Sequence, residues 1–396
     1  MIYDAVIIGA GPAGSCAALA LARQGRAVAI VEKAEFPRRK VCGEFISATN
    51  IALLDSLGVA DAWRAEAGPE IRRVGLFAGE RCVTAAMPRA SGGGYGRALG
   101  RDILDELLLE AAGDAGAEVF QPFRATDIVA DENVSVVRMA SRDRELELRA
   151  PVVIAAHGSW EPGSLPSHLP KRNHRSDLFG FKAHFRHSAL PADLMPLLVF
   201  PGGYGGMVTA DHGRLSLSCC IRRDRLAEIR RTYGGGAADA VHRHIVASCC
   251  GAREAIGEAS LDGQWLAAGP IRPGIRTRFA AGVFRAGNCA GESHPIIAEG
   301  ISMALQSGWL LAAALDGVDV WDRSAREAAA KCYSAAWLRQ FSTRIHAADA
   351  FASIALNPAG AQAMGSVVGL LPGILPLGAT LSGKTRALPE LALQQR

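Results

Sequence analysis

The clearest chemical pattern lies near the start of the chain, where glycines are spaced to let a backbone turn approach a phosphate. The turn reads Gly9-Ala10-Gly11-Pro12-Ala13-Gly14 and follows an apolar stretch over residues 3–8. The helix expected next would direct its N–H groups and the positive end of its dipole at an anion. Glu32 ends a second apolar stretch, where its carboxylate can accept hydrogen bonds from ribose hydroxyls. The sequence therefore predicts a dinucleotide site. Its expected contacts are Gly9, Gly11, Pro12, Ala13, Gly14 and Glu32.

A cysteine that follows a basic run forms the second chemical pattern. Arg38, Arg39 and Lys40 precede Cys42, and Glu44 lies two residues after it. Nearby positive charge favours a thiolate, so Cys42 can be reactive or donate a proton. The carboxylate of Glu44 is a second candidate proton carrier. The structural alternative for Cys42 is a small residue that fills a tight loop.

Two later stretches combine glycines with an expected helix start. Arg101 follows Gly100 at the head of an amphipathic helix predicted over residues 101–112. The other stretch reads Arg285-Ala286-Gly287-Asn288-Cys289-Ala290-Gly291 and continues to Pro295. It ends in Glu299-Gly300-Ile301-Ser302, where a long helix is expected to begin and to run to about residue 315.

These blocks, in this order, resemble the FAD-dependent oxidoreductases that include geranylgeranyl reductases and p-hydroxybenzoate hydroxylase-like monooxygenases. The resemblance reaches to about residue 320. It implies that Arg101 contacts the phosphate and ribose region of FAD. It also implies that Asn288 stands where relatives bind the ribityl chain with an aspartate. The remaining cofactor contacts that we expect are Lys33, Lys40, Gly287, Pro295, Gly300, Ile301 and Ser302.

Three stretches refine this resemblance. Residues 37–45 are similar to the KxCGG segment of geranylgeranyl reductases, which passes the isoalloxazine ring, and Glu44 replaces the second glycine. His157 stands where the hydroxylases carry an acid, and it is either a turn residue or a flavin contact. Residues 200–206 resemble a glycine-tyrosine segment of the reductases' substrate domain. This implies that Tyr204 contacts substrate, and a core position in a β-turn is the alternative.

The expected elements give an α/β fold. The resemblance implies a glutathione-reductase-like FAD-binding Rossmann domain, an inserted antiparallel β-sheet substrate domain and a helical C-terminus. The FAD-binding domain is predicted over residues 1–72, 96–170 and 276–320. The substrate domain is predicted over residues 171–275, with a hairpin contributed by residues 73–95 that turns around residues 78–80. Residues 321–396 would form the helical cover.

Composition limits the partners. The 396 residues carry a net charge of +4, which gives no argument for nucleic acid. Nine cysteines without a CxxC pattern or a zinc spacing predict reduced thiols, no metal and a cytoplasmic location. Residues 350–383 carry no charged side chain but are broken by prolines. We expect short helices that cover the core, and a peripheral membrane contact is the alternative. The oligomeric state stays open.

The function predicted is that of an FAD-dependent oxidoreductase acting on a hydrophobic small molecule of prenyl, polyketide or aromatic type. The reaction is double-bond reduction or flavin-hydroperoxide hydroxylation, with NADPH or NADH as reductant. The loop around Cys42 favours the reductase group. The alternative class is a flavin-binding protein without turnover of its own, because Asn288 and His157 replace acids of the family.

Overall fold

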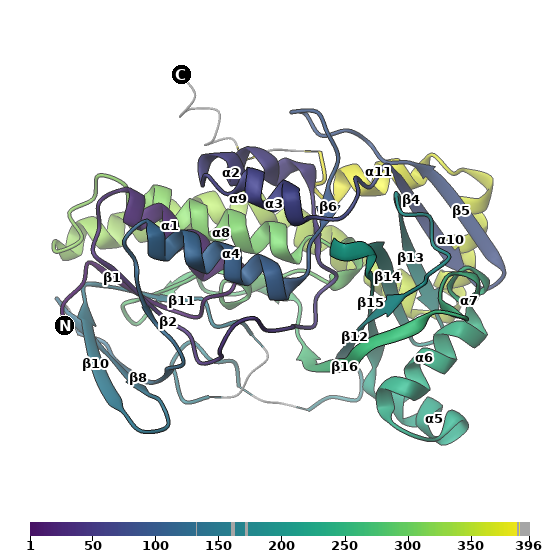
Figure 1. The fold of residues 1–396 in the computed structure, drawn as a ribbon, viewed down its shortest axis with the longest axis horizontal. Coiled ribbons are helices and arrows are strands. Elements are labelled where there is room, and N and C mark those ends of the chain that lie inside the picture. The colour runs from purple at the N-terminus through teal and green to yellow at the C-terminus, as the bar shows by residue number, and fades with distance from the viewer. Residues whose placement is uncertain (132, 160–162, 171–172, 386–387, 389–396) are drawn as a thin grey trace.

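Two β-sheets lie side by side, with long helices packed along the first and crossing toward the second (Figure 1). The computed structural model describes residues 1–131, 133–159, 163–170, 173–385 and 388. The first sheet has six strands in the order β18-β19-β11-β1-β2-β7, all parallel except the β18–β19 pair. These strands are β1 (Ala5–Ile8), β2 (Val28–Val31), β7 (Glu118–Phe120), β11 (Val152–Ala155), β18 (Phe279–Ala280) and β19 (Val283–Arg285).

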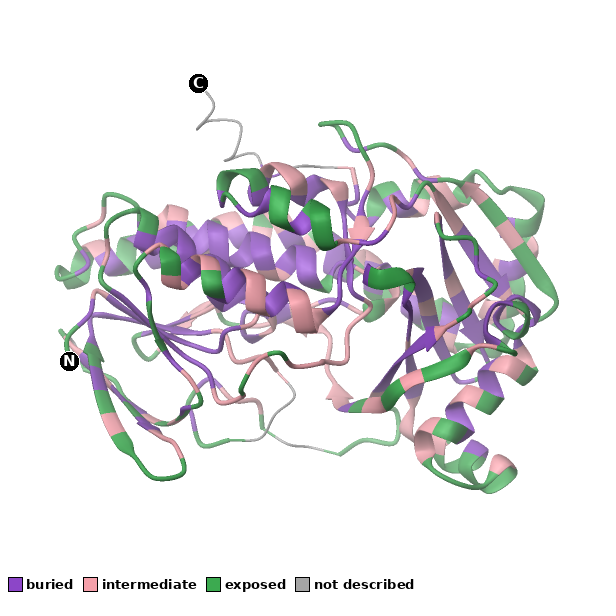
Figure 2. Cartoon of the chain, in the orientation of Figure 1, coloured by how far each residue is buried: buried purple, intermediate pink, exposed green. Residues whose placement is uncertain are grey.

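Successive side chains of β1 point alternately to the two faces of this sheet. Ala5 and Ile7 join the core beneath helices α1 (Pro12–Arg23), α4 (Arg101–Asp114) and α8 (Gly300–Ala314). Val6 and Ile8 join a second core on the opposite face. That face is covered by an antiparallel sheet of β8 (Arg124–Val129), β9 (Ser135–Ala140) and β10 (Glu145–Ala150). Figure 2 shows the buried residues concentrated between these layers.

Short elements connect the two sheets. Strand β3 (Phe45–Ile46) pairs with β6 (Arg97–Ala98), and β17 (Gly274–Ile275) pairs with β20 (Gly291–Glu292). The connecting helical turns and helices are η1 (Ala48–Asn50), α2 (Ile51–Ser56), α3 (Ala60–Glu66), η3 (Gly287–Cys289) and η4 (Pro295–Ile297). The β3–β6 pair brings the loop that carries Cys42 beside the start of α4, so two predicted site segments become neighbours.

The second sheet has seven strands in the order β16-β12-β15-β14-β13-β4-β5. They are β4 (Arg73–Ala78), β5 (Arg81–Ala86), β12 (Leu178–Arg186), β13 (Leu194–Phe200), β14 (Gly203–Thr209), β15 (Leu215–Arg222) and β16 (Ser260–Ile271). The hairpin predicted around residues 78–80 is confirmed as β4–β5. The helices α5 (Arg223–Tyr233), α6 (Ala237–Ser248) and α7 (Cys250–Ile256) pack on one side of this sheet.

The expectation of a purely antiparallel second sheet is wrong at one pair. Strands β4 and β13 run parallel, with Leu76 opposite Leu197 in the register. The β4–β5 hairpin comes from residues 73–86 and pairs at one edge of the sheet, whose other strands all come from residues 178–271. Because a hairpin brought from elsewhere can join in either direction, local sequence patterns do not fix this pairing.

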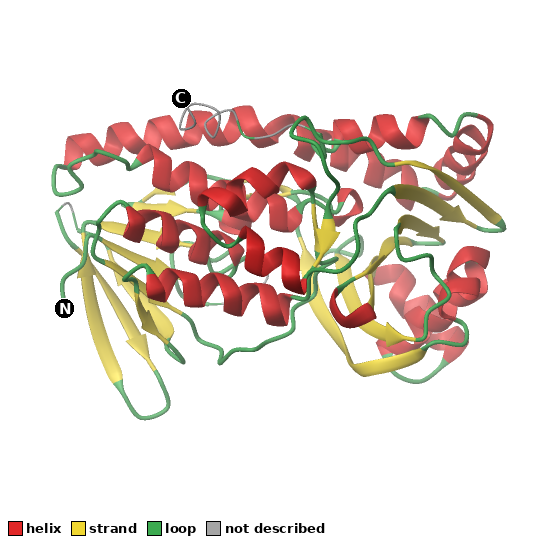
Figure 3. Cartoon of the chain, turned by 45° about the horizontal axis from the view of Figure 1, so that its top comes forward, coloured by secondary structure: helices red, strands yellow, loops and turns green. Residues whose placement is uncertain are grey.

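Three helices follow the core. Helix α9 (Arg323–Leu356) is the long helix at the top of Figure 3, and it contacts both α8 and β14. Asn357 ends α9 and caps α10 (Pro358–Leu370), and α11 (Ile374–Leu381) follows. None of the described helices is by itself both long and apolar enough to cross a membrane. Helices α10 and α11 reach that apolarity only as a pair bent by 117°.

Candidate functional site

One cavity of about 720 Å³ gathers nearly all the residues that the sequence singles out. It lies between the two sheets and extends under the C-terminal helices. Gly14 and Ser302 are the two predicted site residues that do not line it. The predicted residues that line it are Gly9, Gly11, Pro12, Ala13, Glu32, Lys33, Lys40, Cys42, Glu44, Arg101, Tyr204, Gly287, Asn288, Pro295, Gly300 and Ile301.

The glycine turn forms one wall of the cavity, and its glycines have different structural roles. Gly9 has φ +105°, and a Cβ there would lie 2.8 Å from the carbonyl oxygen of Ala156. A Cβ on Gly14 would overlap the carbonyl oxygen of Gly9, so Gly14 serves the packing of α1 on the turn rather than a ligand. A Cβ on Gly11 would meet only the Nη2 of Arg101, at 3.5 Å, because Gly11 faces the cavity.

Glu32 holds the end of β2 against this turn. Its Oε2 accepts a hydrogen bond from the backbone N–H of Ala10 at 2.9 Å, and its Oε1 accepts one from Ala34 at 2.9 Å. Arg38 donates to the same carboxylate at 3.3 Å. These hydrogen bonds fix the carboxylate in place while its side chain borders the cavity, as a ribose contact requires.

Cationic side chains crowd the same end of the cavity. Arg101 makes a two-pronged ion pair with Asp105, at 2.6 and 2.7 Å, which fixes its guanidinium beside Gly11. Burial and the positive charges of Arg38 and Lys33 lower the pKa of Lys40 to about 8. An anion placed here would relieve that repulsion. The glycine turn, the start of α1 and these cations suit a pyrophosphate.

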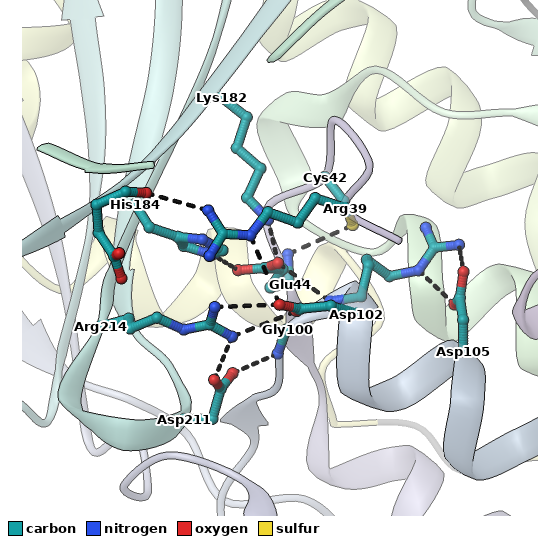
Figure 4. A network of polar contacts seen from close by, with 12 residues as sticks. Arg39, Cys42, Glu44, Gly100, Asp102, Asp105, Lys182, His184, Asp211 and Arg214 are labelled. Carbon is teal, nitrogen blue, oxygen red and sulfur yellow. Dashed lines mark hydrogen bonds and ion pairs between the residues drawn. The ribbon is translucent and has the colours of Figure 1, made fainter. Parts of the chain in front are cut away.

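Glu44 lies between strand β12 of the second sheet and the start of α4 (Figure 4). Its carboxylate pairs with Lys182 and lies 2.7 Å from Nε2 of His184, and all three side chains are buried. It also accepts a hydrogen bond from the backbone N–H of Arg101 at 3.1 Å. Burial alone would raise the pKa of Glu44, but Lys182 and His184 outweigh it and lower the pKa to about 2. The proton-carrying role predicted for Glu44 is therefore not supported by its environment, which keeps the carboxylate ionised.

The backbone explains why a glycine would be expected at this position. Glu44 has φ +63°, in the left-handed region that favours glycine. The buried contacts with Lys182 and His184 hold a residue that carries a Cβ in this conformation. Lys182 and His184 were missed by the sequence reasoning. Their signal is a lysine and a histidine two residues apart, hence on one face of β12, in a strand that is apolar up to Phe181.

A second ion cluster extends this junction. Arg214 bridges Asp102 at 3.1 Å and Asp211, and Asp211 accepts a hydrogen bond from the backbone N–H of Gly100 at 2.6 Å (Figure 4). Arg39 contacts Asp102 at 3.6 Å. The start of α4, the Cys42 loop and the second sheet are thus joined by buried and half-buried ion pairs. Cys42 itself lines the cavity, and its Sγ accepts a hydrogen bond from the N–H of Glu44 at 3.4 Å.

The late block reaches the cavity mainly through its backbone. Gly287 and Asn288 begin η3, and a Cβ on Gly300 at the start of α8 would meet open space. Ser302 does not line the cavity, and its hydroxyl lies 3.1 Å from that of Ser47. His157 lines the cavity, and burial together with the neighbouring His168 lowers its pKa to about 3. A neutral imidazole therefore stands where the family's acid is expected.

Another polar group on the cavity wall was missed by the sequence reasoning. Glu292 accepts a hydrogen bond from Ser159 at 2.6 Å and lies 3.4 Å from Arg276, and burial raises its pKa. The position of Glu292, within the block that begins at Gly287, is the signal that sequence reasoning could have used.

Tyr204, which also lines the cavity, takes part in a polar chain. Its hydroxyl lies 3.1 Å from Nδ1 of His294, and Nε2 of His294 lies 3.3 Å from Asp349.

The far half of the cavity is apolar. Strands β4, β13 and β14 and helices α10 and α11 supply its walls. Its apolar lining includes Leu76, Met195, Met207, Met364, Val368 and Leu375. The site therefore combines a cationic, glycine-lined half with a hydrophobic half. The first half fits the diphosphate of FAD, and the second has the character of a site for a hydrophobic molecule.

Comparison with known proteins agrees with this geometry. The profile of the FAD binding domain family matches residues 2–191. Residues 2–191 of the chain are therefore similar to an FAD-binding domain. Menaquinone reductase of Mycobacterium tuberculosis is 36% identical over 181 residues, which cover 45% of this chain. The match spans 42% of that protein's length, which is less than half.

Two further comparisons cover most of the chain. Digeranylgeranylglycerophospholipid reductase 2 of Methanopyrus kandleri is 29% identical over 360 residues, covering 86% of this chain and 83% of that protein. The myxobacterial FAD-dependent halogenase CndH has a TM-score of 0.74 at 19% identity, covering 100% of this chain and 96% of that chain. The second likeness concerns the fold alone. The resemblance to FAD-dependent oxidoreductases that include prenyl reductases is confirmed.

Proposed function

We propose that this protein uses FAD to reduce a carbon–carbon double bond in a hydrophobic, prenyl-type substrate. The observation that carries the proposal is a cavity with two unlike halves. One half presents Gly11, Arg101 and Lys40 to an anionic cofactor, and the other presents apolar side chains such as Met195 and Val368. A substrate in the apolar half would meet the cofactor where the halves join, beside Cys42.

The names of the relatives support reduction over other chemistry. The two relatives aligned above are reductases whose names refer to menaquinone and to a digeranylgeranyl lipid. Both names denote molecules with long prenyl chains, which would suit the apolar half of this cavity. The Cys42 loop gives independent support, because it resembles the reductase segment and borders the same cavity.

The chain's own residues have separable tasks in this proposal. Reduced FAD, when bound, supplies the hydride. Arg101, Lys40 and the Gly11 turn bind and orient its diphosphate, and Glu32 binds a ribose. The second carbon of the double bond needs a proton. Glu292 is the better donor among the described carboxyl groups on the cavity wall, because burial raises its pKa whereas that of Glu44 is lowered to about 2.

The competing functions are hydroxylation of the same class of molecule with molecular oxygen, and flavin binding without turnover. The test begins with holoprotein reduced anaerobically by NADPH, NADH or dithionite. Menaquinone or a geranylgeranyl lipid is then added, and the product is analysed by mass spectrometry. Dithionite bypasses the natural electron donor, so failure to accept NADPH or NADH does not obscure the result.

A product that still carries two added hydrogen atoms in its prenyl chain after any quinol has been reoxidised in air, and that is absent without the protein, supports the proposed reduction. A product that gains one oxygen atom after air is admitted would identify a monooxygenase and overturn the reductase assignment. A flavin that none of the three reductants bleaches would support the non-catalytic alternative. Glu292→Gln in the first assay should slow product formation and remove the decline in rate that deprotonation of Glu292 causes as the pH rises, with flavin content unchanged.

A further inference from the structure

The bent pair α10–α11 exposes an apolar surface to solvent. Leu370 is 81% exposed and Leu377 is 57% exposed, although leucine side chains in folded proteins are usually buried. We call this surface the α10–α11 face. Its large exposed apolar residues, together with one from the end of α9, are Ile354, Val367, Leu370, Leu371, Ile374, Leu377 and Leu381. No charged side chain occurs over residues 350–383, so the face has no ionic group of its own.

The same face forms part of the cavity wall. Ile354, Val367 and Ile374 are exposed to solvent and also line the cavity. Their neighbours Met364, on α10, and Leu375, on α11, line it from inside. The apolar half of the cavity therefore reaches the molecular surface through apolar side chains. A hydrophobic molecule entering there would not cross a polar rim.

A basic side chain borders the face. Arg81 is exposed on β5 and donates a hydrogen bond to the carbonyl oxygen of Gly365 in α10, at 3.4 Å. Its guanidinium group could therefore meet a lipid phosphate when the apolar face rests on a bilayer.

We propose that the α10–α11 face rests on a lipid bilayer and that the cavity opens into the bilayer's apolar layer. A second protein bound to this face would block the opening of the cavity. Fluid lipid would cover the apolar surface and still let a substrate enter the cavity. The part of the proposal that concerns substrate entry rests on the proposed function. The part that concerns binding to lipid does not.

Binding is tested with the full-length holoprotein and sedimented vesicles of phosphatidylcholine, with and without phosphatidylglycerol. Wild-type protein should bind both and bind the anionic vesicles more tightly. Leu370→Gln and Leu377→Gln should each weaken the partition constant by about tenfold, because each removes an apolar side chain from the lipid contact. Neither residue lines the cavity. Leu261→Gln is the matched control, since Leu261 on β16 is 45% exposed away from this face.

The substrate-entry part is tested by comparing two presentations of one prenyl substrate. Leu370→Gln should slow turnover of substrate embedded in vesicles while leaving turnover of the detergent-dispersed substrate unchanged. Flavin content and circular dichroism verify that the variants fold.

If the wild type fails to bind either vesicle, or if Leu261→Gln loses as much binding as Leu370→Gln, the membrane contact is refuted. A wild-type dimer that Leu370→Gln dissociates, without vesicle binding, would assign the face to self-association instead. Vesicle binding without any turnover would count against the proposed function and leave the lipid contact standing.

Discussion

Oε2 of Glu44 lies 2.7 Å from Nε2 of His184, and this buried contact joins the loop of Cys42 to strand β12 of the second sheet. The same carboxylate pairs with Lys182 and accepts a hydrogen bond from the N–H of Arg101. One side chain therefore connects three parts of the cavity wall. Its position in the left-handed backbone region shows that these contacts hold it in a conformation that favours glycine.

Replacing Glu44 by glutamine should destabilise the fold. The variant leaves the buried ammonium of Lys182 without its anion, which typically costs about 3 kcal/mol of unfolding free energy. Chemical denaturation at neutral pH measures this loss. Glu110→Gln, on the exposed side of α4, is the control and should change stability little.

The pH dependence of that stability has a definite sign. Folding lowers the pKa of Glu44 from 4.5 to about 2, so its contribution is complete above pH 4.5 and disappears as the pH falls toward 2. Wild-type protein should lose this contribution over that window, and Glu44→Gln should lack it. Parallel stability curves for the two proteins from pH 5 to pH 2 would contradict the ionised Glu44.

Two glycines of the same turn should respond differently to alanine. Gly11→Ala should fold normally, because its Cβ faces the cavity, and should weaken FAD binding by roughly tenfold or more. Gly14→Ala should destabilise the apoprotein by about 1–3 kcal/mol, because its Cβ would overlap the carbonyl of Gly9. Apoprotein unfolding and FAD titration measure the two effects. Equal FAD affinity in wild type and Gly11→Ala would place the diphosphate elsewhere.

FAD affinity should decline above pH 8. The pKa of Lys40 is about 8 in the protein without ligand, and an adjacent diphosphate would raise it. The attraction is therefore complete below pH 8 and weakens as the pH rises above it. Lys40→Gln should cost about 1–3 kcal/mol of binding free energy at neutral pH and should flatten this decline. Lys331→Gln, exposed on α9, should behave as wild type in the same fluorescence titration.

Cys42→Ala separates a role in the reaction from a role in the loop. If the thiol acts at the flavin, FAD content should stay nearly unchanged, and turnover per bound flavin should fall by roughly a hundredfold. Cys332→Ala, exposed on α9, is the control. Unchanged turnover per flavin and unchanged product would remove Cys42 from the site.

The parts of this site that sequence predicted depend on near neighbours along the chain. The Gly9–Gly14 turn, the strand that ends at Glu32 and the start of α4 at Arg101 each follow from a short pattern with one stable geometry. The sequence does not reveal the buried ion pairs of Glu44, because the partners that hold its pKa low come from strand β12, far along the chain. The sequence shows their residue types but not which loop they will meet.

Pairings between distant segments account for the other differences. The parallel contact of β4 with β13, the ion cluster around Arg214 and the position of Glu292 beside Ser159 arise only when separate segments assemble. The apolar stretch over residues 350–383 was predicted as a cover built from short helices. Helices α10 and α11 form such a cover, and their outer side is unexpectedly apolar. The predicted domain boundaries and the nicotinamide reductant stay predictions.

The identity of the bound cofactor tests the central claim most directly. The protein is purified or reconstituted with a mixture of FAD and FMN, washed and denatured, and the released flavin is identified by chromatography. The account predicts a yellow protein that releases FAD, because Gly11, Arg101 and Lys40 form a diphosphate site and Glu32 stands at a ribose. Release of FMN alone, or no retained flavin from a folded protein after reconstitution, would contradict it.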